Sequence, residues 1–319
     1  GGKGMALEIP KVSYSGKIKE IVLGKGDKAL TVGGETSYPF YLFEGQMSLK
    51  PRIAMEVYDS KPEDWAPTAL EPFADVAGDP VAWAKKCIDT YGAEMIALQL
   101  VGTDPNGENR SAEEAAALTK KVAEAVDVPL IVWGCNNAEK DTEVLKKIAE
   151  DCAGRNLMIG PVTEANYKQV GAVAIGYEHT VIASTPIDIN LAKQLNILLG
   201  NLGVPDGRIL IDPTTGALGY GLEYGYSVME RIRMAALTQE DERLQFPMIC
   251  NLGKEVWKTK EAKQSRDEAP KLGDPAKRGV LMEAITAQLV LAAGADILIM
   301  RHPESIALIQ DMLNDLLAA

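Results

Sequence analysis

A regular alternation of short apolar runs and amphipathic segments begins at Pro51 and continues along the rest of the chain. Short apolar runs bounded by turn residues are typical of buried strands, and each run here is followed by a segment with helical spacing. Eight such units in roughly 270 residues match the usual size of a (β/α)8 barrel. We therefore predict an α/β fold, a (β/α)8 TIM barrel over residues 51–319, with strands near residues 53–57, 95–100, 129–133, 157–160, 180–183, 209–212, 247–250 and 297–300.

A doubly wound open sheet is the alternative architecture for this pattern. It would need fewer strands, and it usually carries a phosphate-binding glycine loop directly after the first strand. The residues that follow the run at 53–57 do not form such a loop, which favours the barrel.

Local signals predict where several of the helices begin. Ser111 and Glu114 have the spacing of a capping box, which predicts a helix over residues 111–126. Thr185 followed by Pro186 predicts a helix over residues 186–202, capped by Thr185 and with Pro186 in its first turn. The apolar stripe of this helix is expected to comprise Ile187, Leu191, Leu195, Leu198 and Leu202. A further helix is expected over residues 275–293, carrying Leu281, Ile285, Gln288 and Ala292.

The first fifty residues differ from the repeating pattern. Residues 17–23 and 28–32 are strand-like and flank Lys25-Gly26-Asp27, which predicts a small β-hairpin. We interpret residues 1–50 as an N-terminal β-hairpin extension that plugs or caps the barrel. The alternative is a surface hairpin with no role beyond stability.

Charge and cysteine content exclude several classes of function. The net charge is −12, without a basic cluster, which argues against nucleic acid and anionic membranes as partners. No apolar run approaches the ~20 residues that span a bilayer. Cys87, Cys135, Cys152 and Cys250 form no C-x-x-C pair, so we expect no iron–sulfur cluster or zinc bound by this chain alone. Four unpaired thiols and no secretion signal predict a cytoplasmic location.

Polar side chains stand where the predicted strands end, and in a barrel these positions ring one mouth. The set is rich in amides, and only Glu56 and Asp212 could take up a proton at neutral pH. This composition favours hydrogen bonding to a large neutral ligand over acid–base hydrolysis, so we predict no catalytic residue. The alternative is that these groups satisfy backbone atoms at the barrel end. The residues are Glu56, Gln99, Trp133, Asn136, Ser184, Asp212, Asn251 and Arg301.

The stretch from Arg208 to Arg233 shows this strand-end pattern most clearly. Pro213 cannot donate to a strand ladder, so the strand ends at Asp212, and a loop with Gly216, Gly219 and Gly221 follows. This loop resembles the Asp-Pro, glycine-rich loop of pterin-binding barrels such as dihydropteroate synthases. The lysine that closes the loop in those enzymes is missing here.

A set of motifs in fixed order gives a more specific resemblance. They are GGE at 33–35, PF at 39–40, FEG at 43–45, PIDIN at 186–190, KQLN at 193–196, IDP at 211–213, GYGLEY at 219–224, MERIR at 229–233 and LIMRHP at 298–303. Together they resemble the small subunit of the corrinoid iron–sulfur protein, the delta subunit of acetyl-CoA decarbonylase/synthase. The resemblance covers about residues 17 to 310.

The resemblance implies a heterodimer whose large subunit carries a cobalamin and a four-iron cluster, while the small subunit is a barrel that docks on and shields the corrinoid. The pair takes a methyl group from methyltetrahydrofolate through a separate methyltransferase and delivers it to CO dehydrogenase/acetyl-CoA synthase. This chain lacks an Asp-x-His-x-x-Gly corrinoid motif, which fits the partner subunit rather than the cofactor carrier. The expected corrinoid contacts are Ser184, Asp212, Gly216, Gly219, Gly221, Asn251 and Arg301.

Two other functions remain as alternatives. One is a free-standing pterin-dependent methyltransferase barrel, which tight binding of methyltetrahydrofolate by the isolated chain would support. The other is a conventional lyase or hydrolase barrel, which the shortage of general bases disfavours.

Overall fold

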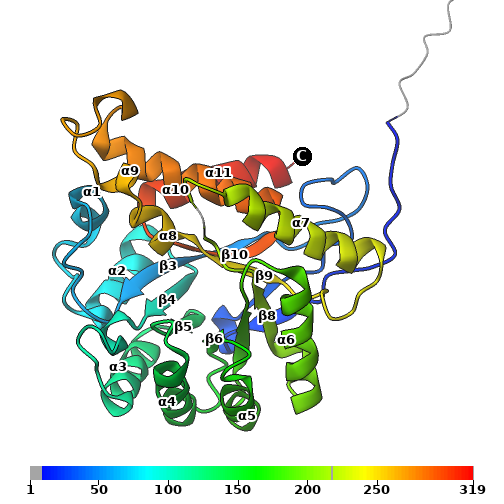
Figure 1. Ribbon diagram of the computed structural model, residues 1–319, viewed down its shortest axis with the longest axis horizontal. Coiled ribbons are helices and arrows are strands. Elements are labelled where there is room, and N and C mark those ends of the chain that lie inside the picture. Colours follow the sequence, from blue (N-terminus) through cyan, green and yellow to red (C-terminus); the bar gives the residue numbers. More distant parts are fainter. Residues whose placement is uncertain (1–8, 217, 319) are drawn as a thin grey trace, which may run out of the picture.

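Eight parallel strands close into a barrel in the computed structural model, which describes residues 9–216 and 218–318 (Figure 1). The last strand pairs with both the first and the preceding strand, so the sheet has no free edge and the (β/α)8 prediction is confirmed. The open-sheet alternative is wrong for the same reason. The barrel strands are β3 (Arg52–Tyr58), β4 (Met95–Gln99), β5 (Leu130–Trp133), β6 (Met158–Val162), β7 (Thr180–Ser184), β8 (Ile209–Asp212), β9 (Met248–Asn251) and β10 (Ala295–Met300).

An outer ring of helices covers the barrel, one after each strand (Figure 1). The predicted capping box of Ser111 and Glu114 is present at the start of α3. The ring consists of α2 (Pro80–Tyr91), α3 (Ala112–Ala125), α4 (Ala138–Asp151), α5 (Tyr167–Tyr177), α6 (Ile189–Leu202), α7 (Leu222–Thr238), α10 (Pro275–Ala292) and α11 (Pro303–Leu317). Short helices occupy the long loops after β3 and β9, namely α1 (Pro67–Leu70), α8 (Leu252–Trp257) and α9 (Lys260–Lys263).

The predicted start of helix α6 is wrong. Asp188 is its cap, and its carboxylate accepts hydrogen bonds from Asn190 N–H at 2.7 Å and Leu191 N–H at 3.2 Å. Thr185 instead extends the line of β7, because its N–H donates to the Asp212 carbonyl at 3.2 Å. A carboxylate that accepts hydrogen bonds from two backbone N–H groups caps a helix well. Because the helix begins only after Asp188, the residues before it are not helical and form part of the barrel mouth.

The expected apolar faces of α6 and α10 are also partly wrong. On α6 the buried face contains Ala192, Leu195 and Leu199, while Leu191 is exposed. On α10 the side chains of Leu281 and Ile285 are exposed, and small residues, among them Gly279 and Ala284, form part of the buried face. Tight packing explains this choice, since a Cβ at Gly279 would lie 2.3 Å from the Trp257 ring, so a larger residue would push the helix outward.

The N-terminal extension closes the amino-terminal end of the barrel. Strands β1 (Ile21–Leu23) and β2 (Leu30–Val32) form the predicted antiparallel hairpin. Ile21, Leu23 and Val32 are fully buried and pack with the inward-facing side chains of the barrel strands. The hairpin sits against residues that precede strands, because Lys19 N–H donates to the Gln245 carbonyl and the Asn156 amide donates to the Val22 carbonyl. The hairpin is therefore a plug, which leaves the carboxyl-terminal end as the open mouth of the barrel.

Candidate functional site

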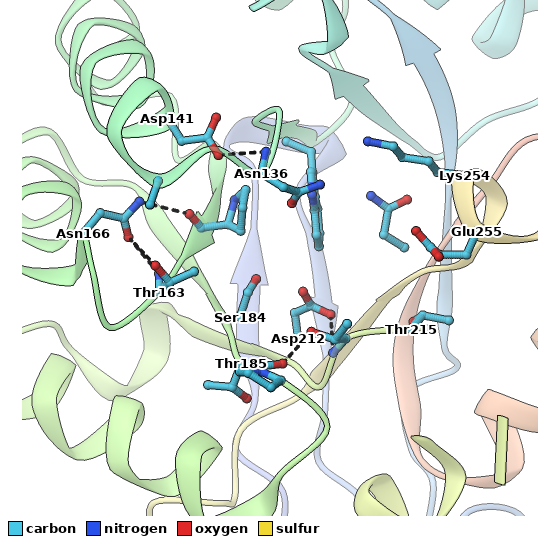
Figure 2. Close-up of a pocket in the computed structure, with 16 residues that line it drawn as sticks. Asn136, Asp141, Thr163, Asn166, Ser184, Thr185, Asp212, Thr215, Lys254 and Glu255 are labelled. Atoms are coloured by element: carbon cyan, nitrogen blue, oxygen red, sulfur yellow. Dashed lines mark hydrogen bonds between the residues drawn. The ribbon is translucent and has the colours of Figure 1, made fainter. Parts of the chain in front are cut away.

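A cavity of about 450 Å³ opens at the carboxyl-terminal mouth of the barrel, over the ends of β5 to β9 (Figure 2). Its position follows from the period of the strands, since side chains two residues apart both point inward and the last inward residue of each strand faces the mouth. The cavity is lined by Trp133, Asn136, Ala138, Asp141, Pro161, Thr163, Asn166, Ser184, Thr185, Pro186, Asp212, Thr214, Thr215, Asn251, Lys254 and Glu255. Three predicted site residues, Ser184, Asp212 and Asn251, therefore meet in one cavity.

Asp212 provides a buried carboxyl group in the wall of the cavity. Its side chain is only 4% exposed, and Oδ1 accepts a hydrogen bond from Thr214 N–H at 3.0 Å. Burial raises the pKa of the Asp212 carboxyl to about 6, although the Ser184 hydroxyl and Thr214 N–H oppose the shift and the charge of Glu255 adds to it. One carboxyl oxygen thus satisfies a backbone N–H group of the following loop, which is the alternative role expected for these strand-end residues. The carboxyl group also faces the cavity.

Several hydroxyl groups lie near this carboxyl in the cavity wall. Thr185 is 6% exposed, yet its hydroxyl oxygen makes no hydrogen bond with the residues described. The Ser184 hydroxyl, in a residue that is 7% exposed, interacts with the Asp212 carboxyl and holds its pKa down. Ser184 Oγ lies beside Asp212 and points into the cavity (Figure 2). Thr215 Oγ1 is similarly without a partner in the described part of the chain, whereas Thr214 Oγ1 donates to the Thr185 carbonyl. This wall of the cavity therefore has unused hydrogen-bonding capacity.

Asn251 is largely satisfied by a partner from the opposite side of the barrel. Gln99 Nε2 donates to Asn251 Oδ1 at 2.9 Å, and Asn251 Nδ2 donates back to Gln99 Oε1 at 3.3 Å. The two amides form a buried bridge between the ends of β4 and β9. Asn251 can thus offer a ligand only the hydrogen-bonding positions that Gln99 leaves unused.

Asp141 holds the backbone of the opposite cavity wall in place, and the sequence analysis did not single it out. This fully buried carboxylate accepts hydrogen bonds from Cys135 N–H at 2.8 Å and Asn136 N–H at 3.0 Å. Burial raises the pKa of Asp141 to about 6, and these bonds oppose the rise. They hold Asn136 at a φ of 69°, with its amide among the cavity-lining groups. In the sequence Asp141 has the position of an ordinary acidic residue in a first helical turn, so the pattern did not distinguish it.

Arg301 is not brought into the cavity. Its Nε donates to Glu56 Oε2 at 2.6 Å, and its Nη2 donates to the Tyr58 hydroxyl at 2.8 Å. Its guanidinium carbon lies 3.6 Å from the centroid of the Trp65 ring, which the long loop after β3 places over it. Arg301 is buried, and its contacts lie in the other half of the mouth, so it supports that half without reaching the surface.

The glycine loop forms part of the rim. Gly219 has a φ of 87°, which favours glycine, while a Cβ at Gly216 would meet only Thr214, at 3.9 Å. Gly221 precedes α7 with an extended φ of 162°. The neighbouring side chains of Tyr220 and Tyr224 are 84% and 65% exposed. The segment that follows the cavity-lining Thr215 therefore carries two large aromatic side chains in solvent.

The described residues contain neither a candidate metal site nor a candidate membrane-spanning helix. Residues 9–216 and 218–318 contain no group of three or more His, Cys, Asp or Glu side chains placed to hold a metal ion. Over the same ranges, none of the helices has the length and apolar character needed to cross a membrane.

The fold and the site define a (β/α)8 barrel with a polar cavity at its mouth and a hairpin plug at its base. Solved dihydropteroate synthases share this fold. The Xanthomonas albilineans enzyme with 4-aminobenzoic acid superposes with a TM-score of 0.59 at 16% identity, over 94% of this chain and 98% of that one. The Thermus thermophilus enzyme gives 0.54 at 17% identity, over 92% and 99%. At such identities the likeness concerns the fold alone.

Closer sequence relatives identify the family. Residues 20–314 match the family model of the CO dehydrogenase/acetyl-CoA synthase delta subunit. The acetyl-CoA decarbonylase/synthase complex subunit delta of Archaeoglobus fulgidus is 37% identical over 96% of this chain and 70% of its own length. The corresponding Methanopyrus kandleri subunit is 36% identical over 91% and 71%. The chain therefore belongs to the delta subunit family, as the motifs indicated.

Proposed function

We propose that this chain is the small subunit of a heterodimeric corrinoid iron–sulfur methyl carrier within an acetyl-CoA decarbonylase/synthase complex. In this role the barrel docks on the large subunit, which carries the cobalamin and the four-iron cluster, and shields the corrinoid between methyl transfers. The carrier takes its methyl group from methyltetrahydrofolate through a methyltransferase and passes it to CO dehydrogenase/acetyl-CoA synthase. The proposed compartment is the cytoplasm, where the four free cysteines would stay reduced.

The exposed aromatic rim is the observation that carries this proposal. Tyr220 and Tyr224 stand in solvent in the segment that follows the cavity-lining Thr215, and aromatic side chains are enriched where one protein docks on another. The same rim includes Gly216 and Gly219, where the missing side chains let a partner approach the backbone closely.

The polar groups of the mouth also fit a corrinoid, whose rim bears carboxamide side chains. The hydroxyls of Ser184, Thr185 and Thr215 have spare hydrogen-bonding capacity, and primary amides both donate and accept. The cobalt chemistry would come from the partner's cofactor, while this chain would exclude water and restrain the carboxamides. Because the methyl transfer would take place at the partner's cofactor, we assign Asp212 no proton transfer.

Co-purification with the large corrinoid subunit, followed by visible spectroscopy of the cobalt centre, tests the proposal. Gly216→Glu places bulk and charge on the rim, and the glycine backbone there accepts a Cβ without a clash. We expect this variant to weaken the complex on the order of tenfold or more. Gly219→Val should weaken it too, but its positive φ adds backbone strain, so Gly216 is the cleaner position.

Gly207→Glu is the matched control, because Gly207 is exposed in the turn that precedes β8, at the opposite end of the barrel, with open space around a Cβ. Equal binding by the two glutamate variants would contradict docking through the mouth. Asp212→Ala should leave methyl transfer nearly unchanged. A loss on the order of 10²-fold with intact partner binding would instead indicate acid–base catalysis by this chain.

The free-standing methyltransferase remains the competing function, and the same preparation distinguishes it. An isolated chain that transfers a methyl group from methyltetrahydrofolate to free cobalamin, without the large subunit, would replace the docking proposal.

A further inference from the structure

Two carboxyl groups meet one guanidinium group at the amino-terminal end of the barrel. Glu35 follows the hairpin, Asp296 lies in β10 and Arg233 lies in α7, and these residues are 5%, 3% and 2% exposed. Arg233 and Asp296 form an ion pair, and Arg233 Nη2 also donates to the Gly294 carbonyl at 2.6 Å. The carboxyl groups of Glu35 and Asp296 lie within hydrogen-bonding reach of each other. We refer to these three side chains as the Glu35 cluster.

The charges of the Glu35 cluster do not balance if both carboxyl groups are ionised. The cluster lines a cavity of about 10 Å³, which has room for no more than one water molecule. One guanidinium group thus faces two carboxyl groups that solvent cannot hydrate. A second buried carboxylate would lack a counter-ion, which is costly, so one of the two carboxyl groups holds a proton. The other described residues that line the cavity are uncharged, namely Ser37, Pro39, Met47, Leu291, Gly294 and Ala295.

The hydrogen bonds assign this proton to Glu35. Asp296 Oδ2 accepts from Met248 N–H at 2.6 Å and from Arg233, whereas Glu35 Oε2 is buried and accepts from no donor group in the described residues. A protonated Glu35 supplies an O–H group to Asp296, while an ionised Glu35 would face a like charge. Burial and the charge of Asp296 also raise the pKa of Glu35 well above its usual value, although Arg233 opposes the rise.

Glu35 lies where the hairpin continues into the rest of the N-terminal extension. Gly34 N–H before it donates to the Ile18 carbonyl at 3.0 Å, and Thr36 N–H after it donates to the Gln46 carbonyl at 3.0 Å. The loop over residues 36–46 therefore begins and ends beside the Glu35 cluster. We propose that Glu35 is a neutral acid at neutral pH, that the proton it shares with Asp296 fixes residues 33–47 to the barrel, and that alkaline pH loosens this segment.

Infrared spectroscopy of the full chain in D2O at pH 8 tests the protonation state. At this pH the carboxyl groups of Asp59, Asp141 and Asp212, whose pKa burial raises to about 6, are ionised. The wild-type chain should show the carbonyl band of a protonated carboxyl group, and Glu35→Gln should lose the intensity of one such group. Glu20→Gln is the matched control, because Glu20 lies in the same extension with its side chain 52% exposed. No loss in Glu35→Gln, or an equal loss in the control, would overturn the proposal.

Hydrogen–deuterium exchange tests whether the proton holds the segment. Glutamine is neutral, similar in size and able to donate an N–H group to Asp296, so Glu35→Gln should fold, and residues 33–47 should exchange within about twofold of the wild-type rate at pH 7. Glu35→Ala should exchange there about tenfold faster or more, because it loses the hydrogen bond and leaves Asp296 without it.

The dependence of this exchange on pH separates the shared proton from simple packing. Between pH 7 and pH 9 the segment should exchange increasingly faster in the wild-type chain than in Glu35→Gln, because loss of the proton makes Glu35 repel Asp296, whereas glutamine does not titrate. Comparing the two chains at each pH cancels the intrinsic change in exchange rate. Identical pH profiles, or failure of Glu35→Gln to fold, would overturn the proposal.

Discussion

Replacing Asp212 with asparagine should stabilise the protein at neutral pH. Burial raises the pKa of this carboxyl from 3.8 to about 6, a difference of about two units. Because the folded state binds the proton more tightly than the unfolded state, stability falls as the pH rises from the unfolded pKa to the folded one. The cost is complete above the folded pKa and amounts to ~3 kcal/mol at ~1.4 kcal/mol per unit.

Asparagine removes this cost while keeping the shape of the side chain. Its amide oxygen can still accept from Thr214 N–H, and it stays neutral at every pH. We therefore expect Asp212→Asn to raise the free energy of unfolding by up to ~3 kcal/mol at pH 8. The gain should fall to about half of that at pH 5, where the buried carboxyl is mostly protonated.

Urea unfolding at several pH values, followed by circular dichroism, measures the difference. Asp188→Asn serves as a control, because asparagine also caps a helix and the side chain lies at the start of α6. A gain that does not grow between pH 5 and pH 8, or a loss of stability at pH 8, would refute the reasoning. A gain would show that this buried carboxyl is retained at the expense of stability.

Three further variants test the fold, each by the same urea titration. Ile21→Ala in the hairpin plug should cost ~2–5 kcal/mol because this side chain is fully buried, whereas its exposed neighbour Val22→Ala should cost less than ~0.5 kcal/mol; equal effects would mean that the hairpin does not plug the barrel. Arg301→Ala should cost ~3–5 kcal/mol by leaving Glu56 buried without its ion-pair partner, and a loss under ~1 kcal/mol would contradict this. Gly33→Ala should lower stability by more than ~2 kcal/mol, since its Cβ would lie 2.1 Å from a backbone oxygen at a φ of 91°; wild-type stability would show that the turn can shift.

The barrel was predictable because its signal is local and repeated. A run such as Ile209 to Asp212 shows its strand character within a few residues, and Pro213 marks where it stops. The capping box at Ser111 is equally local, as the side chain bonds a backbone group three residues away. Period-2 alternation also indicates which strand-end side chains face the mouth, so Ser184, Asp212 and Asn251 could be singled out as a set.

What the mouth contains was decided by contacts between distant segments. Arg301 and Asp212 occupy similar strand-end positions, but the loop after β3 places Trp65 over Arg301 and leaves Asp212 facing the cavity. Likewise, nothing near Asp141 in the sequence marks it as the residue that holds Asn136.

The sequence by itself therefore determined the number of strands, the side chains that could face the mouth and the family. The tertiary structure alone decided which of those side chains are covered and which share a cavity. The physical reason is that strand period and helix caps depend on neighbours in the chain, whereas burial, and with it the raised pKa of Asp212, depends on residues brought together only by folding.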